Sequence, residues 1–156
     1  MSKQTIVSGT RQAFGSWEGI RGGFVKADAN FTELYNTVCL SFTIMPHASK
    51  TVYNLFTADQ VYTVKSIRYV PDVAQGATLT ATAVKATSTA TPASATTPLH
   101  SAAGINCNGT AHTVQSITLT TTTADLSLAS GDRIGLVLSG ALSTRSGCLS
   151  IRVGLN

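Results

Sequence analysis

The stretch VKADANFTELYNTVCLSFTIMP, residues 25–46, changes its hydrophobic period in the middle. Its first half continues a series of apolar residues three or four apart, which is the spacing of a helix. From Val38 onward the apolar residues fall two apart, which predicts a strand over 38–45. One short helix is therefore expected to lead directly into a β-strand. The helical series consists of Phe24, Ala27, Phe31, Leu34 and Val38.

The predicted helix has Asp28 as a possible N-cap and Glu33 in its first turns, where a carboxylate suits the helix dipole. A helix of about three turns is marginal alone in water, so its apolar stripe must be buried. The stripe could pack on the β-body, on copies of itself around a symmetry axis, or on a partner.

The chain after this helix alternates apolar and polar residues in short runs separated by turn residues. This pattern predicts an all-β body of about eight antiparallel strands, a jelly-roll-like sandwich, with an up-and-down barrel as the alternative. The body is preceded by an extended N-terminal arm and the short helix. The strands are expected near 38–45, 51–57, 61–70, 77–87, 101–107, 112–120, 133–139 and 147–155.

Two strands carry further detail. In the last strand Leu149, Ile151, Val153 and Leu155 alternate with polar residues, so they are expected to share the inward face. In the third strand the apolar phase slips, which predicts a β-bulge at Lys65-Ser66.

A jelly roll makes the first and last strands antiparallel neighbours. This arrangement would place Cys39 near Gly154 and Cys148 near Met45, too far apart for a disulfide. Cys107 completes an odd set of cysteines without CxxC spacing, so we expect three reduced thiols.

Turns are predicted at Pro71-Asp72, Asn108-Gly109 and Gly131-Asp132. The low-complexity stretch over 86–102, which contains Pro92 and Pro98, is expected to form a loop that caps one end of the sandwich.

Length and composition favour a single soluble domain. The chain has 156 residues, enough to bury a core without staples, and only 12% of them are charged. Low charge with abundant Ser and Thr is typical of extracellular and virion β-proteins. The sequence contains neither a signal-peptide core nor an apolar run long enough to span a bilayer, so we expect synthesis in the cytoplasm and no membrane partner.

The net charge of +4 does not predict a nucleic-acid partner. After residue 37 the basic residues stand singly among Thr and Ala, without the clusters and stacking aromatics that follow a phosphate backbone. They are expected to be solvated on strand faces. These residues are Lys50, Lys65, Arg68, Lys85, Arg133, Arg145 and Arg152.

Residues 1–36 are interpreted as a docking and oligomerisation segment, and 37–156 as the β-sandwich body. The first 23 residues are rich in Gly, Ser and Thr and cannot build a core. Trp17 in a basic arm suits an interface anchor, although packing on its own domain remains open. The expected interface residues are Arg11, Phe14, Trp17, Phe24, Phe31, Leu34 and Tyr35.

No catalytic motif is found in the sequence. Asp125 and Asp132 flank a turn and are interpreted as turn formers. His100, Cys107 and His112 form only a loose set of possible metal ligands, without HExxH or CxxC spacing. We therefore expect no enzyme activity, no cofactor and no metal.

The segment KADANFTELYN, residues 26–36, resembles the K-x-N-x-N-F-x-E-L-Y segment near the N-terminus of many tailed-bacteriophage fibre and virion proteins. Asp28 stands where that pattern more often has Asn. The blocks at 58–72, 113–120 and 128–140 are similar to those of small phage virion β-domains. The resemblance implies a structural protein of the virion, often trimeric, that decorates a head or forms a fibre or spike.

Together these features predict a non-enzymatic capsid decoration, cement or head-fibre protein. It would be a homotrimer that docks on the major capsid protein or another virion protein through its arm and helix. The alternative is a tail fibre or spike protein that binds a receptor or a host glycan. The stretch 86–102 has no aromatic residue for holding sugar, which favours decoration.

Overall fold

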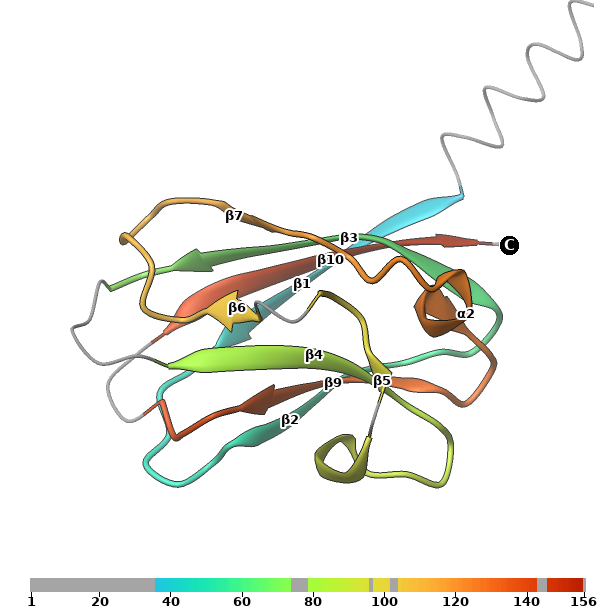
Figure 1. The fold of residues 1–156 in the computed structure, drawn as a ribbon, viewed down its shortest axis with the longest axis horizontal. Coiled ribbons are helices and arrows are strands. Elements are labelled where there is room, and N and C mark those ends of the chain that lie inside the picture. The colour runs from blue at the N-terminus through green and yellow to red at the C-terminus, as the bar shows by residue number, and fades with distance from the viewer. Residues whose placement is uncertain (1–35, 74–78, 96, 102–103, 143–145, 156) are drawn as a thin grey trace, which may run out of the picture. The chain divides into compact units, whose positions relative to one another are not determined.

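The computed structural model describes residues 36–73, 79–95, 97–101, 104–142 and 146–155. The chain divides into two units, Met1–Asn36 and Thr37–Asn156, and the second is described here by itself. It is an all-β sandwich of two antiparallel sheets with their faces packed together (Figure 1). The predicted arm and helix lie outside the described residues.

The first sheet has the order β1-β10-β3-β7, and β8 pairs with β3. The second sheet has the order β2-β9-β4-β5, and β6 pairs with β4. The strands of the first sheet are β1 (Thr37–Ile44), β10 (Gly147–Leu155), β3 (Tyr62–Pro71), β7 (Gln115–Ile117) and β8 (Ser127–Leu128). Those of the second are β2 (Val52–Thr57), β9 (Arg133–Leu138), β4 (Thr80–Ala86), β5 (Thr97–Pro98) and β6 (Ile105–Asn106). A 3-10 helix, η1 (Pro92–Ser94), and a short helix, α2 (Thr123–Leu126), complete the described elements.

The long strands lie where the alternation predicts them. The strands predicted over 101–107 and 112–120 are much shorter than expected, since only β6 and β7 form regular ladders there. β5 and β8 were not predicted, because two residues are too few to show a period.

The predicted bulge in β3 is confirmed. Arg152 lies opposite Ser66 and Val153 opposite Val64, so Lys65 is the extra residue. The bulge lets Val64 and Ile67 both face the core, where each is 1% exposed.

The pairing of the first and last strands is also confirmed, with a register displaced by two residues from the expected one. Cys39 lies opposite Arg152, and Cys148 lies opposite Thr43. Cys39, Cys107 and Cys148 are all described, and none of them forms a disulfide.

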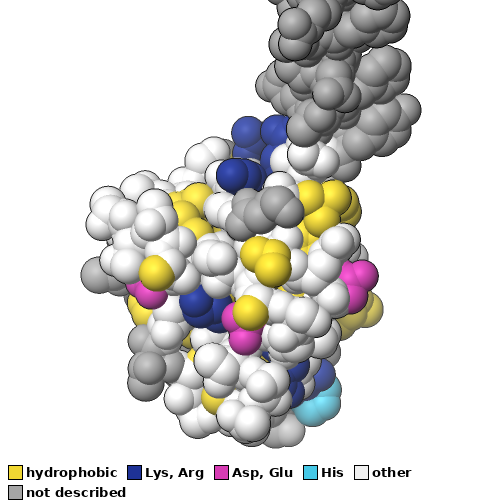
Figure 2. All heavy atoms as spheres, turned by 90° about the vertical axis from the view of Figure 1, so that its right-hand side faces the viewer, with side chains coloured by type: hydrophobic (Ala, Val, Ile, Leu, Met, Phe, Trp, Pro, Cys, Tyr) yellow, Lys and Arg dark blue, Asp and Glu magenta, His cyan; other side chains and the backbone are white. Residues whose placement is uncertain are grey.

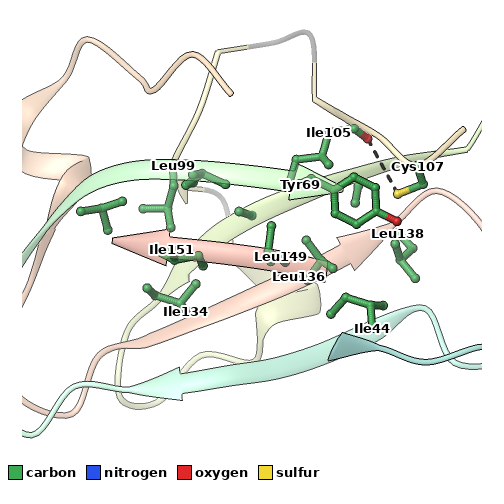
Figure 3. Packing of buried hydrophobic residues seen from close by; sticks show 14 of the residues in the cluster. Ile44, Tyr69, Leu99, Ile105, Cys107, Ile134, Leu136, Leu138, Leu149 and Ile151 are labelled. Atoms are coloured by element: carbon green, nitrogen blue, oxygen red, sulfur yellow. Dashed lines mark hydrogen bonds between the residues drawn. The ribbon is translucent and has the colours of Figure 1, made fainter. Parts of the chain in front are cut away.

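The core lies between the two sheets and is filled mostly by aliphatic side chains, with Tyr69 and Cys107 among them (Figure 3). Leu149 and Ile151 of β10 face Ile134 and Leu136 of β9, and this confirms the inward face of the last strand. Burying one such side chain fully stabilises the fold by about 1.5–3 kcal/mol. Among the described residues, no helix is long and apolar enough to cross a membrane.

The sequence predicts that the segment after β4 caps one end of the sandwich. The structure instead places parts of this segment against the second sheet. Gly135 alternates with the core residues of β9 and therefore faces away from the core. An ideal Cβ at Gly135 would come within 2.3 Å of the Cβ of Pro92, so η1 covers the outer face of the second sheet at this point. Further along, β5 joins the edge of that sheet by pairing with β4.

A turn is present at Asn108, as predicted, but it does not connect a hairpin. β6, before it, pairs with β4 of the second sheet, whereas β7, after it, pairs with β3 of the first. The turn therefore carries the chain from one sheet to the other.

Candidate interaction surfaces

The residues predicted to form the docking interface all lie outside the described residues. They are Arg11, Phe14, Trp17, Phe24, Phe31, Leu34 and Tyr35. Of the helical series only Val38 is described, and it belongs to β1, where 42% of it is exposed.

The loose set of metal ligands is not a metal site. His100 is buried, its Nε2 accepts a hydrogen bond from the Ala83 amide at 3.1 Å, and its Nδ1 lies 2.7 Å from the Ser101 carbonyl oxygen. This pattern fits a neutral ring that donates from Nδ1 and holds two backbone groups. The Cys107 thiol is buried beside the Ile105 carbonyl, while His112 is exposed. Within the described ranges, no three His, Cys, Asp or Glu side chains are placed to hold a metal ion.

Two basic residues predicted to be solvated serve the fold instead. Lys85 donates from Nζ to the carbonyl oxygens of Ala124 and Ser127, at 2.8 and 3.1 Å. Arg133 donates to carbonyl oxygens of the segment before η1, among them that of Ala90. The sequence could not show this, because the acceptors are backbone groups far along the chain.

The carboxylates near the turns also have structural partners. Asp132 accepts a hydrogen bond from the Ala129 amide at 2.9 Å, which confirms its predicted role as a turn former. Asp59 accepts a hydrogen bond from the Tyr62 hydroxyl at 2.7 Å.

One side of the sandwich is closed by the segment that includes β5. Leu99 donates its amide to Ala83 of β4 at 2.9 Å, and its carbonyl accepts from Thr120 at 3.2 Å. Ser101 donates to Thr118 at 2.9 Å. Because it bonds to β4 of the second sheet and to the chain that follows β7 of the first, this segment links the two sheets along that side.

The opposite side, formed by β1 and β2, is called here the open side. Five of its side chains contact the core but stay only partly buried, whereas Ile44 at the end of β1 is buried like the core residues of β10. No described strand pairs with the free edge of β1 or of β2. These side chains are Leu40 and Phe42 of β1 and Tyr53, Leu55 and Phe56 of β2.

Lys50 and Met45 lie beside Tyr53 at the margin of the open side. The Lys50 ammonium sits 4.5 Å from the centre of the Tyr53 ring, a cation–π contact. The Tyr53 hydroxyl donates to the Met45 carbonyl at 3.4 Å, and burial raises the pKa of the Tyr53 phenol.

Apolar side chains are also exposed at the end of the sandwich where β1 begins and β10 ends. Val38 and Val61 are 42% and 46% exposed, and Leu155, opposite Tyr62, is half-buried. Figure 2 views the molecule from this end and shows hydrophobic side chains on the surface among polar ones.

The outer face of the first sheet has a different character. A row across four strands places Ser41, Ser150, Arg68 and Ser116 side by side. Arg152 of β10 lies opposite Ser66 of β3, which makes it the diagonal neighbour of Arg68. Both guanidinium groups are exposed, and the described residues that face outward on this sheet include no carboxylate. We call this surface the serine–arginine face.

Comparisons with protein-family models, with curated proteins and with solved structures find no match to this chain. The similarity of residues 26–36 to phage virion proteins therefore stays a prediction. The function has to be argued from the surfaces described above.

Proposed function

We propose that this chain is a non-enzymatic structural protein of a bacteriophage virion, a capsid decoration or cement protein or a head-fibre protein. It docks on the major capsid protein or another virion protein through residues 1–36, and the β-sandwich faces outward. Three copies assemble around the apolar stripe that runs from Phe24 to Leu34.

The observation that carries this proposal is that His, Lys, Arg and Asp side chains of the body form hydrogen bonds that stabilise the fold. His100, Lys85 and Arg133 hold backbone groups in place, and Asp132 holds a turn. Such a body suits mechanical reinforcement. Among the described residues, two of the exposed large apolar side chains, Val38 and Val61, lie at the end where β1 begins, whereas Met45, Val73 and Val114 are exposed elsewhere.

We also propose that the sandwich is a jelly roll with eight principal strands. The strand orders β1-β10-β3-β7 and β2-β9-β4-β5 support it, since β1 to β4 alternate between the sheets and the first and last strands are neighbours. On this view β5 and β6 are parts of one interrupted strand and β8 is a minor addition.

Trp17 provides the direct test of docking because it is the only tryptophan of the chain. Its fluorescence should change when the protein is mixed with particles stripped of their native copies. Trp17→Ala should weaken co-sedimentation with those particles by about 30-fold, the effect of losing an anchor worth about 2 kcal/mol.

The matched control is Val114→Ala, which removes an exposed apolar side chain, 58% accessible, from the β-body. This variant should bind particles as the parent does. Equal binding by Trp17→Ala and the parent would contradict docking through the arm. A low-resolution map of the virion would show whether the protein lies on the head or on the tail.

A second candidate function, binding of a host glycan by a tail fibre or spike, is supported by the serine–arginine face. Arg guanidinium groups suit sulfate and carboxylate groups, and serine hydroxyls suit sugar hydroxyls. Binding of sulfated or sialylated oligosaccharides that is lost in Arg68→Ala and Arg152→Ala, and retained in Lys50→Ala, would favour this function over decoration.

A further inference from the structure

The free edges of the two sheets differ in how they are protected from pairing with another strand. β7 has three residues, and the chain after it is bonded to the segment that closes that side. β5 has two residues and ends in Pro98, which lacks an amide proton. β2 carries a bulge, because Asn54 lies opposite Gly135 and Phe56 opposite Ile134, which leaves Leu55 without a partner.

β1 has none of these protective features. It is eight residues long, and its register with β10 is continuous from Thr37 to Ile44. Its sequence, TVCLSFTI, contains no charged residue and no proline. Natural proteins protect long edge strands because unpaired peptide groups and apolar side chains recruit another strand. No described strand pairs with this edge, so β1 from Val38 to Ile44 can take a strand from another chain.

The charge of the open side is compatible with contact by a second copy of the chain. β1 and β2 contain no Lys, Arg, Asp or Glu, so neither strand would repel a second copy of this positively charged chain. Leu40 and Phe42 on β1 and Leu55 and Phe56 on β2 offer apolar area that folding leaves partly exposed. A contact between copies would remove this apolar area from water, which favours association.

We propose that the open side is the contact between copies, with the β1 edge of one copy lying against the β2 edge of the next. Two different edges make a head-to-tail contact, and such a contact closes into a ring when the rotation permits. The inference rests on the self-association in the proposed function and names the surface of the body that carries it. β1 follows residue 36 directly, so it starts where the predicted helix ends.

The test compares two pairs of lysine substitutions in the full chain. Ser41→Lys/Thr43→Lys places two charges on the exposed outward positions of β1. Ser116→Lys/Thr118→Lys makes the same chemical change at exposed positions on and just after β7, the other end strand of the same sheet. Light scattering across a concentration series gives the mass of each variant, with circular dichroism as the folding control.

The parent is expected to have the mass of three chains. The β1 variant should need at least 10-fold more protein to associate, whereas the β7 variant should keep the parent mass. Equal association of the β1 variant and the parent would overturn the inference, as would equal loss in both variants or a parent with the mass of one or two chains. Particle co-sedimentation is a separate readout, so virion docking could fail while the contact between copies holds, or the reverse.

Amide hydrogen exchange gives a second, independent measurement. In an antiparallel pair only alternate amides of an edge strand bond to the neighbouring strand. The remaining β1 amides should become protected as the parent associates, and they should stay unprotected in the Ser41→Lys/Thr43→Lys variant. Protection of β1 that does not depend on concentration would count against a second copy as the partner.

Discussion

Gly135 shows how one missing side chain holds a surface segment against a sheet. A Cβ at this position would lie 2.3 Å from the Cβ and 2.5 Å from the Cγ of Pro92, and 3.2 Å from the carbonyl oxygen of Tyr53. The proline is buried, although it stands in a stretch composed mostly of Ala, Ser and Thr. The absence of a side chain on β9 therefore lets η1 cover the sheet.

Gly135→Ala is expected to destabilise the fold by about 1–3 kcal/mol, because the added methyl group overpacks a site lined by backbone and a rigid ring. Chemical denaturation measures this cost. Gly140→Ala is the matched control, since its Cβ would meet only the flexible end of Leu79 at 3.3 Å.

The same substitution should cost less in a Pro92→Gly background, because the atoms it would strike are then absent. If Gly135→Ala destabilised the protein no more than Gly140→Ala, the packing of η1 on β9 would be wrong.

At the scale of elements, the bulge in β3 makes a deletion informative. Lys65 is the extra residue between Val64 and Ser66, which already oppose consecutive residues of β10. Deleting Lys65 restores a regular ladder and leaves Val64, Ile67 and Tyr69 on the core side. We expect this variant to fold, with a loss of about 2 kcal/mol or less.

Deleting Arg68 from the same strand is the control. Arg68 is exposed like Lys65, but its removal would turn either Ile67 or Tyr69, both buried, toward solvent. This variant should fail to fold, as judged by circular dichroism and thermal melting. Similar stability of the two deletion variants would contradict the observed register.

The success and failure of prediction at this scale have a physical cause. Alternation over six or more residues identifies β3 and β10, and the break in the alternation of β3 locates the bulge. β5 and β8 depend on distant partners and have no period of their own. His100 looked like a possible metal ligand because the sequence hides its actual partners, the peptide groups of Ala83 and Ser101.

The candidate surfaces were also hard to predict, because they too depend on residues that are far apart in the sequence. Arg68 and Arg152 stand singly in the sequence, and only the pairing of β3 with β10 makes them neighbours. The open side was missed because β1 has the same alternation as a covered strand. The alternation of apolar and polar residues identifies the inward face of a strand. Which strand pairs with its edge depends on the topology of the sheet.

At the scale of the whole molecule, the described residues of the body form a core of their own between the two sheets. The buried members of this core run from Ile44 to Val153. A chain that starts at Thr37 should therefore fold as a β-protein. We expect its melting temperature within about 5 °C of the parent value, which at this size corresponds to about 1–2 kcal/mol.

The truncated chain separates folding from docking. It should show the β-type circular dichroism spectrum of the parent body and should no longer co-sediment with stripped particles, because the expected anchors Arg11, Phe14 and Trp17 are absent. The full chain with Trp17→Ala is the matched comparison, since it keeps the stripe from Phe24 to Leu34.

Binding of the truncated chain at the level of the parent would move the docking site onto the β-surface, where the apolar end around Val38 and Val61 would be the first candidate. Failure of the truncated chain to fold would instead make residues 1–36 part of the stable fold, and the open side of the sandwich would be the first place to seek their contacts.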